Sequence, residues 1–417
     1  MDLAQWLEKI TTLHPQFIDL GLERVNQVKE RLAISPACPL IIVGGTNGKG
    51  SCVAALEAIY IAAGYKVGTF TSPFLFRYNE EIKIQGVEAT DAELCQAFEQ
   101  IEQARGEMTL TYFEWSCLAS FLIFQQAQRD VWILEVGLGG RLDAVNCMDA
   151  DIAIVTTVAL DHMDRLGHTR EEIGWEKAGI FRAGKVAICG DFSPPLSLIH
   201  HAKTIQAKLY CQGKDFHYKE ENTDWHWSSQ TKKITHLPFN SLALQNLSTA
   251  LMAVELLQDK LPIENNKIKQ GLKKINLIGR IQVIHQDQIT HVFDVSHNPA
   301  AVKRLAEWLT KHFPPTIKIK AVFSMLKDKD ILSTISVIKN QIHHWYVAPL
   351  TNERAASLEQ LNNEFVKANI NALSCYASIE AAYQYALQEA QPHEAVVVFG
   401  SFYTVAVCLR RITAKSA

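Results

Sequence analysis

The 417-residue sequence lacks the features that mark membrane, secreted and nucleic-acid-binding proteins. No apolar run approaches the ~18 residues of a membrane span, and the first residues, MDLAQWLEKI, do not join a basic segment to an apolar one. Basic residues are not in excess, because 41 Lys and Arg stand against 44 Asp and Glu and leave a formal net charge of -3. We therefore expect a cytoplasmic protein that binds neither membrane nor nucleic acid.

The nine cysteines include no CxxC pair, the spacing that most directly indicates a zinc site or a redox centre. Scattered cysteines of this kind are typical of free thiols in a reducing compartment. The sequence also contains no internal repeat and no low-complexity tract. These absences indicate an ordinary globular protein. Its fold must therefore be predicted from the order of strand and helix patterns along the chain.

Short apolar segments alternate with helical patterns in the first half of the chain. Each is rich in β-branched residues and bounded by Gly, Pro or Asp, which is typical of strands buried in a parallel sheet. These segments are PLIIV (39–43), KVGTF (66–70), VWILEV (131–136), DIAIVTTV (151–158) and KVAIC (185–189). They predict a mostly parallel sheet with helices on both faces.

A different pattern follows. Residues 209–238 are polar and aromatic with local alternation, which predicts a small antiparallel sheet, and residues 244–257 predict a helix. Near residue 280 strand patterns begin again at HVFDV, IKIKAVF, HHWYVA and EAVVVFG, with helical patterns between them. Because a chain of this length exceeds one ordinary core, we expect two α/β domains, residues 1–280 and 281–417.

The segment VGGTNGKGS, residues 43–51, is a glycine-rich loop between a predicted strand and a predicted helix that begins near Ser51. Such a loop points backbone N–H groups at phosphate oxygens, and Lys49 reaches the outer phosphates. The match to the common phosphate-loop pattern is imperfect, since Gly50 stands where Ser or Thr is usual. The alternative is a turn that binds nothing. The predicted contacts are Gly45, Thr46, Asn47, Gly48, Lys49, Gly50 and Ser51.

Polar side chains follow the other predicted strands. Ser72 comes after KVGTF, Glu135 ends VWILE, and Asp161 and His162 follow DIAIVTTVAL. In an open α/β sheet, ligands bind outside the carboxyl ends of the strands. Oxygen ligands suit Mg²⁺, although each of these residues taken alone is also compatible with a cap, an ion pair or a structural role. The pattern predicts a magnesium–nucleotide enzyme without naming its acceptor.

A series of segments, in order along almost the whole chain, resembles the folylpolyglutamate synthase/dihydrofolate synthase family of the Mur ligase-like superfamily. They are GGTNGKGS (44–51), TSPFLFRYNEEIKI (71–84), LTYFE (110–114), LEVGLGGRLDAVN (134–146), ALDHMDRLG (159–167), EKAGIFR (176–182), GR (279–280), DVSHNPAA (294–301) and FGSFYTVA (399–406).

The resemblance implies an N-terminal P-loop ATPase domain and a smaller C-terminal Rossmann-like glutamate ligase domain. It implies ATP-dependent joining of L-glutamate to dihydropteroate and to the γ-carboxylate of tetrahydrofolates through an acyl phosphate, as part of folate biosynthesis and one-carbon metabolism. The implied cofactors are ATP and Mg²⁺ at two sites, with a monovalent cation as a further candidate. A monomer is expected.

The resemblance also implies residue roles. Ser72 and Glu135 would bind one Mg²⁺ and His162 the second, while Lys177 matches a lysine that is carbamoylated in the family. Lys49, Lys177 and His162 would then be the catalytic residues. The alternative for Lys177 is a surface salt bridge.

Nucleotide contacts beyond the loop would come from Asn246 on the adenine side, Arg280 near the phosphates, and Asp294 and His297, with the base and ribose between the domains. Asn298 and Pro299 are expected to shape their turn. Four residues would lie near the pterin: Thr111, Phe113, Asp143 and Ala144.

The sequence departs from the family pattern at Val145, Ser296 and Tyr403. Three alternatives to a bifunctional ligase remain open at this point. The first is a folylpolyglutamate synthase only. The second is another Mur-type amino acid ligase, although the loop at residue 44 leaves no room for a preceding uridine-nucleotide domain. The third is a nucleotide-dependent switch, which would not need a second α/β domain.

Overall fold

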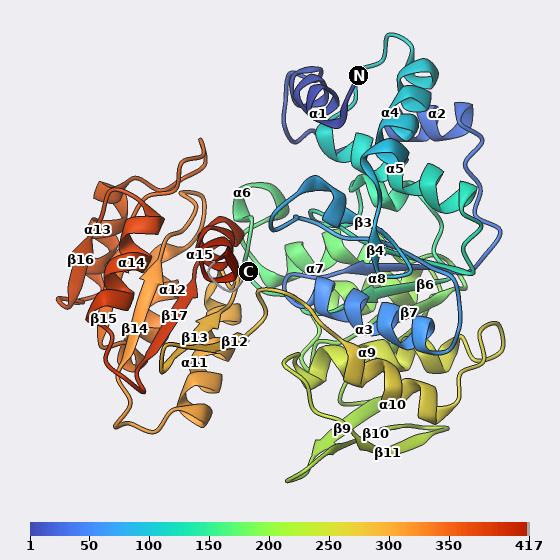
Figure 1. Cartoon of the computed structure of the whole chain (residues 1–417). Coiled ribbons are helices and arrows are strands. Elements are labelled where there is room, and N and C mark those ends of the chain that lie inside the picture. The colour runs from blue at the N-terminus through green and yellow to red at the C-terminus, as the bar shows by residue number, and fades with distance from the viewer. Residues whose placement is uncertain (415–417) are drawn as a thin grey trace. The chain divides into compact units, whose positions relative to one another are not determined.

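The computed structural model describes residues 1–414, and the chain divides into two compact units, Met1–Asn276 and a second that starts at Leu277 (Figure 1). Both units are layered α/β structures, so the predicted class is confirmed. Within the described residues, no helix is long and apolar enough to cross a membrane.

The first unit is built on an eight-stranded sheet in the order β4-β3-β2-β5-β1-β6-β7-β8. The six strands from β2 to β8 run parallel, whereas β3 and β4 form an antiparallel extension at one edge. The strands are β1 (Leu40–Gly44), β2 (Val67–Phe70), β3 (Ile82–Ile84), β4 (Val87–Glu88), β5 (Val131–Glu135), β6 (Ile152–Val155), β7 (Val186–Cys189) and β8 (Lys208–Cys211).

Helices cover both faces of this sheet, and further helices pack against them. The helices of the first unit are α1 (Leu3–Thr12), α2 (Glu23–Arg31), α3 (Lys49–Ala62), α4 (Asp91–Arg105), α5 (Tyr112–Gln126), α6 (Met163–Leu166), α7 (Arg170–Ala178), α8 (Leu196–Thr204), α9 (Leu244–Leu256) and α10 (Asn265–Lys274). Short 3₁₀ turns occur at η1 (Tyr78–Glu81) and η2 (Ala144–Cys147).

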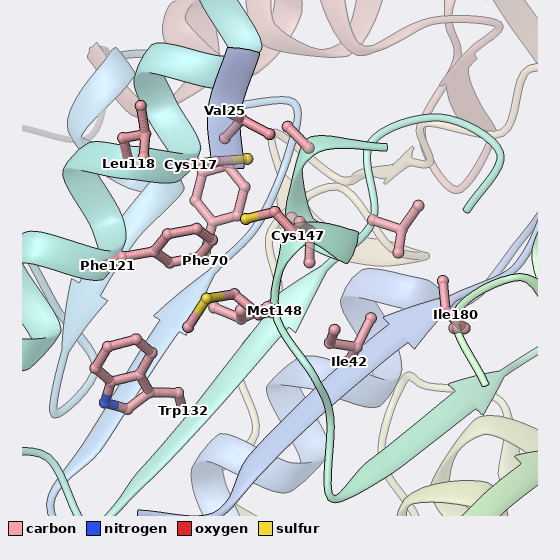
Figure 2. Close-up of a cluster of buried hydrophobic side chains, with 14 of the residues drawn as sticks. Val25, Ile42, Phe70, Cys117, Leu118, Phe121, Trp132, Cys147, Met148 and Ile180 are labelled. Atoms are coloured by element: carbon pink, nitrogen blue, oxygen red, sulfur yellow. The ribbon is translucent and has the colours of Figure 1, made fainter. Parts of the chain in front are cut away.

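The core on one face lies between the sheet and α5. Figure 2 shows Phe70 of β2 and Trp132 of β5 among side chains of α5, and the ring of Phe121 stacks 6.2 Å from that of Trp132. Ile41 and Ile133 are also fully buried, but alternate strand residues point to opposite faces, so they pack on the other side, where α3 contacts β1, β2 and β5.

The helix α3 is held in turn by α9 and α10. A Cβ atom on Gly271 of α10 would lie 2.6 Å from the Cα atom of Ile59 in α3. Glycine is therefore the residue that permits this close approach of two helix backbones. The phosphate-loop helix is thus fixed by the sheet beneath it and by a tightly packed helix outside it.

The predicted small antiparallel sheet is confirmed, with strands β9 (Phe216–Glu220), β10 (Trp225–Ser229) and β11 (Lys233–Leu237) in the order β11-β10-β9. Its predicted beginning at residue 209 was wrong, because Lys208–Cys211 is β8 and pairs in parallel with β7. This edge strand is partly exposed and lacks the long apolar run that marks its neighbours.

The second unit holds a six-stranded sheet in the order β12-β13-β17-β14-β15-β16, parallel except for β12. Its strands are β12 (Gln282–Gln286), β13 (Ile289–Phe293), β14 (Ile319–Phe323), β15 (His344–Val347), β16 (Leu373–Cys375) and β17 (Ala395–Phe399). Its helices are α11 (Pro299–His312), α12 (Ile331–Ile338), α13 (Leu358–Lys367), α14 (Ile379–Glu389) and α15 (Phe402–Ala414), with a 3₁₀ turn at η3 (Lys339–Gln341).

Candidate active site

The phosphate loop leaves β1 at Gly44 and enters α3 at Lys49, two residues earlier than predicted. Two of its glycines are required by geometry. Gly45 has φ +139° and a Cβ there would lie 1.9 Å from the hydroxyl oxygen of Thr156, while Gly48 has φ +89° and a Cβ there would lie 2.3 Å from Oδ1 of Asn246. Side chains at either position would push the loop off the residues it rests on.

Hydrogen bonds pin the loop to the segment that follows β6. The backbone N–H of Thr46 donates to the carbonyl of Thr157 at 2.7 Å, and that of Asn47 donates to the Thr157 hydroxyl at 3.1 Å. The hydroxyl of Thr156 donates to the carbonyl of Asn47 at 2.7 Å. The amides of Thr46 and Asn47 are therefore used inside the protein rather than turned toward a phosphate.

The first turn of α3 is the better anion cradle. A helix leaves its first N–H groups without intrahelical acceptors, which here applies to Lys49, Gly50 and Ser51. The positive end of the helix dipole lies at the same place. Lys49 is half-buried, and its ammonium donates to the carbonyl oxygens of Gly45 at 3.2 Å and Thr46 at 3.4 Å.

The sheet order places the predicted metal ligands beside this loop. The strands β2, β5, β1 and β6 are neighbours and parallel, so their carboxyl ends share one edge. Ser72 follows β2, and Glu135 ends β5 with only 5% of its surface exposed. A Cβ on Gly50 would lie 3.5 Å from Oε2 of Glu135, so this carboxylate sits against the first turn of α3. A hydroxyl and a buried carboxylate beside an anion cradle are ligands that Mg²⁺ accepts.

Lys177 is buried and not a surface residue. It lies on α7 with 3% of its surface exposed. The pKa of its amine is lowered to about 7, mainly by burial and also by the charge of Lys49, while the charges of Asp161 and Asp143 oppose the shift. Two cations and two carboxylates thus share one electrostatic environment, and a neutral Lys177 amine is available near pH 7.

His162 adopts an uncommon backbone conformation immediately before α6. Its φ of +50° lies in the left-handed region, which is rare for residues other than glycine. The backbone N–H of His162 donates to Oδ1 of Asp161 at 2.9 Å, so the Asp161 side chain is held against the backbone of His162. Strained residues of this kind cluster at functional sites.

Two of the predicted pterin residues, Thr111 and Phe113, lie at the N-terminal end of α5. The Thr111 hydroxyl accepts a hydrogen bond from the Glu114 amide as the N-cap of α5. Phe113, which is partly exposed, packs its ring against that of Phe70 at 5.6 Å and lies over Gly137, where a Cβ would come within 2.6 Å of the ring.

Asp143 and Ala144 lie in the loop between β5 and β6. The Asp143 carboxylate accepts backbone N–H groups from Leu138 at 2.8 Å and Val145 at 3.0 Å, and burial raises its pKa to about 7. It holds this loop in shape, while Ala144 is buried beside it. A substrate contact for Thr111, Phe113, Asp143 and Ala144 stays a prediction.

Asn246 faces the phosphate loop from α9. It is 2% exposed, and within residues 1–414 its Nδ2 has no hydrogen-bond partner. A buried amide donor without a partner in the protein costs free energy unless a ligand accepts from it. This geometry fits the predicted contact with a nucleotide.

The predicted residues of the second unit also gather at one sheet edge. Asp294 follows β13 and accepts N–H groups from Ile281 and Ser296, both at 2.9 Å. The Arg280 guanidinium lies 5.1 Å above the Phe402 ring, and the His297 ring lies 6.2 Å from it. The expected turn role of Asn298 is confirmed, since its side chain caps α11 with Pro299 at the first helical position.

Sequence reasoning missed Glu81. This glutamate is 3% exposed, and burial raises its pKa to about 8, with the Glu135 charge adding to the shift and a hydrogen bond from Ser116 opposing it. A second acid therefore lies close enough to Glu135 to feel its charge. The paired glutamates in RYNEEIKI are the sequence signal that points to it, but only the fold shows which one is buried.

The comparisons with known proteins identify the family. The Mur ligase middle domain model matches residues 43–254, and the Mur ligase glutamate ligase domain model matches residues 279–402. Over 417 residues the chain is 42% identical to the dihydrofolate synthase/folylpolyglutamate synthase of Escherichia coli (strain K12), covering 99% of this chain and 96% of that relative. This chain belongs to the dihydrofolate synthase/folylpolyglutamate synthase family.

Solved structures agree with this family. E. coli FolC in complex with DHPP and ADP has a TM-score of 0.95 and 41% identity, covering 100% of this chain and 99% of that one. A bifunctional folylpolyglutamate synthase/dihydrofolate synthase with Mn, AMPPNP and L-glutamate bound has a TM-score of 0.92 and 42% identity, covering 99% and 98%.

The buried amine of Lys177 gives a pH-dependent stability. Its pKa of about 7 in the folded state lies below its ordinary value of 10.5, so between these pH values the unfolded chain holds the extra proton and wild-type stability rises with pH. Lys177→Met removes this dependence. We expect its stability advantage over the wild type to shrink by about 2 kcal/mol between pH 7 and pH 9, measured by urea unfolding.

Lys203→Met on the exposed surface of α8 is the matched control, and its difference from the wild type should not change over this pH range. If the difference in unfolding free energy between Lys177→Met and the wild type is as independent of pH as that of the control, Lys177 titrates like an exposed lysine.

Proposed function

We propose that this chain joins L-glutamate to dihydropteroate and to the γ-carboxylate of reduced folates, with ATP converted to ADP and phosphate. The family and the ligands named for its solved relatives support this activity. The observation in the structure that carries it is the shared edge of four parallel strands, where the first turn of α3, Lys49, Lys177 and Glu135 come together. We further propose that it works as a monomer in the cytoplasm, and its free cysteines support a reducing compartment.

In the first step the acceptor carboxylate attacks the γ-phosphorus of ATP, and ADP leaves. This chemistry is mostly positioning and neutralisation of charge. The amides of Lys49, Gly50 and Ser51 and the Lys49 ammonium would hold the phosphate oxygens. Ser72, Glu135 and His162 would hold Mg²⁺, which supplies further positive charge on the transferred group when bound.

In the second step the glutamate amine attacks the acyl carbon of the acyl phosphate. Phosphate leaves, the new amide forms and the amine loses a proton. The negative charge that develops on the acyl oxygen and the leaving phosphate requires cationic groups close by, and Lys49 and a bound metal would meet this requirement.

Lys177 fits the carbamate that we propose at this position. A carbamate forms when a neutral amine attacks CO₂ and releases a proton, and burial supplies the neutral amine near pH 7. The product is an anion, which converts a cation that repels Lys49 into a group that attracts it and that can help hold the second metal.

Asn246 would bind the nucleotide from the first unit, since its amide donor needs an acceptor. In the second unit Arg280, Asp294 and His297 are the proposed nucleotide residues, and Arg280 and His297 both lie beside the ring of Phe402. Tyr403, one of the residues that depart from the family pattern, is 53% exposed, so its side chain is not part of the buried core.

Release of ADP tests the activity and the loop together. We expect release to require glutamate together with either dihydropteroate or tetrahydrofolate, and Lys49→Ala to lose it with both acceptors because a charge contact to the transferred phosphate is gone. Lys66→Ala is the control for loss of a positive charge, because Lys66 is an exposed lysine directly before β2 and outside the phosphate loop. Lys49→Ala with substantial activity would refute the phosphate-loop assignment. Turnover with tetrahydrofolate alone would leave a folylpolyglutamate synthase.

Phe113 tests how two acceptors of different length reach one phosphate. Both must bring a carboxylate within about 3–3.5 Å of the γ-phosphorus, which one rigid pterin position cannot achieve for both. We expect Phe113→Ala to lower kcat/KM for dihydropteroate more than for tetrahydrofolate. Phe192→Ala, an exposed aromatic outside α5, is the control.

Equal losses for the two acceptors in Phe113→Ala would indicate a shared pterin position. Asp143 is unsuited to this comparison, because its carboxylate holds the backbone of Leu138 and Val145 and its removal would disturb the loop itself.

A further inference from the structure

The outer face of the small antiparallel sheet carries a group of histidines and carboxylates that the ligase reaction does not use. Trp225 and Trp227 of β10 are both buried and point inward. Because strand residues alternate, His226 between them points to the opposite face. Lys219 of β9 is paired with it in the ladder.

A bulge brings a second histidine to the same place. In the β10–β11 pairing, Trp227 is opposite Ile234 but Trp225 is opposite Leu237. Between these pairs β10 contributes only His226, whereas β11 contributes Thr235 and His236, which is the arrangement of a β-bulge.

The bulge has a definite consequence for His236. In a regular ladder His236 would lie opposite Trp225, on the buried face. The extra residue gives that position to Leu237, which is fully buried, and His236 takes a φ of +56°. Its ring then lies 5.4 Å from the ring of His226. A non-glycine residue is rare in this conformation, so the bulge has a backbone cost and directs one imidazole to another.

Asp224 connects the two rings. Its Oδ1 is 3.1 Å from Nε2 of His226, and its Oδ2 is 2.7 Å from Nδ1 of His236. The three ligand atoms all lie within 4.8 Å of one another. Oε2 of Glu221 is a further 3.4 Å from Nε2 of His226. His236 is largely exposed, so the group is open to an ion from solvent.

The residue types select the class of ion. Two imidazoles and a carboxylate suit borderline transition-metal dications such as Zn²⁺, whereas Mg²⁺ prefers an all-oxygen set. With neutral histidines the two carboxylates, Asp224 and Glu221, and the ammonium of Lys219, which lies 3.3 Å from Glu221, leave one net negative charge. That charge favours a cation.

We propose that Asp224, His226 and His236 form a binding site for a divalent transition-metal cation of the Zn²⁺ class that cross-links β10 and β11. On binding, Nε2 of His226 and Nδ1 of His236 each give a lone pair to the ion, and the hydrogen of each neutral ring resides on its other nitrogen. No proton is consumed. The site is separate from the oxygen ligands at the edge of the main sheet.

An ion that links β10 to β11 would stabilise the small sheet against which α9 packs. The indole N–H of Trp227, on the inner face beneath His226, donates to the carbonyl of Ser248 in α9 at 3.1 Å. Asn246, beside the phosphate loop, belongs to the same helix. An ion that fixes β10 against β11 therefore stabilises the sheet on which this helix rests, and its binding should raise the unfolding temperature.

The experiment uses the full chain with Cys375→Ser, which removes an exposed thiol, and excess Mg²⁺ to fill the oxygen-ligand sites. Titration with Zn²⁺ in a calorimeter should show a saturable site that raises the unfolding temperature. Co²⁺ in its place should give the visible absorption of a nitrogen-ligated ion. His226→Ala and His236→Asn should each weaken binding at least about tenfold, comparable with or beyond the loss seen when ligand support is removed.

His236→Asn is chosen because asparagine tolerates a positive φ, so the bulge survives while the imidazole is lost. His217→Ala is the matched control, an exposed histidine on β9 of the same sheet and outside the group, and it should bind like the parent protein. Far-ultraviolet circular dichroism and ADP release with Mg²⁺ confirm that each variant is folded. Absence of saturable Zn²⁺ binding, or binding in both His226→Ala and His236→Asn as tight as in the parent protein, would show that the group is a hydrogen-bonded network only.

Discussion

The close approach of the phosphate loop to Thr156 and Asn246 is the constraint on which the active-site edge depends. At Gly45 and Gly48 there is no space for a Cβ atom, and the loop backbone rests directly on the segment after β6 and on α9. Hydrogen bonds from Thr46 and Asn47 to Thr157 fix it there. Because those amides are bonded within the protein, the loop is held in this position without a ligand, and the N–H groups in the first turn of α3 are the ones without intrahelical acceptors.

Around this rigid loop the protein concentrates ionisable groups at a cost to its stability. Lys177 and Glu81 are almost completely buried. Burial lowers the pKa of Lys177 and raises that of Glu81, and both shifts favour the neutral form of the side chain. A buried charge without full compensation is unfavourable, so these groups are not explained by folding alone. In the proposed function, a triphosphate with its metal ions would bring several charges to the same edge. Such ligands would account for groups that the free protein holds at a disadvantage.

The sequence predicted the central strands of both sheets because each is a short run rich in apolar, β-branched or aromatic residues. It did not predict the edge strands β8, β12 and β16, which are short or polar and owe their conformation to a neighbour. The hairpin from β12 to β13 turns at Asp287 and Gln288, both at positive φ, without the glycine that would signal such a turn.

The candidate site was predictable to a similar extent. Chain order and strand ends placed Ser72, Glu135 and the loop on one edge, since the carboxyl ends of parallel strands meet there. Glycine spacing could not show which loop amides bond within the protein and which remain available at the start of α3. That difference depends on Thr157, which is more than a hundred residues away from the loop in the sequence. The same holds for His236, whose position follows from a bulge that no local sequence pattern announces.

Transfer of a carboxylate oxygen to phosphate tests the central claim, that this edge activates an acid by phosphorylating it. Dihydropteroate labelled with ¹⁸O in its carboxylate would be incubated with unlabelled ATP, glutamate and Mg²⁺ in unlabelled water, and the released phosphate analysed by mass spectrometry. The account predicts that the phosphate carries an ¹⁸O atom from the carboxylate, because the acyl phosphate breaks between the acyl carbon and that oxygen. Unlabelled phosphate formed together with dihydrofolate would contradict an acyl-phosphate intermediate.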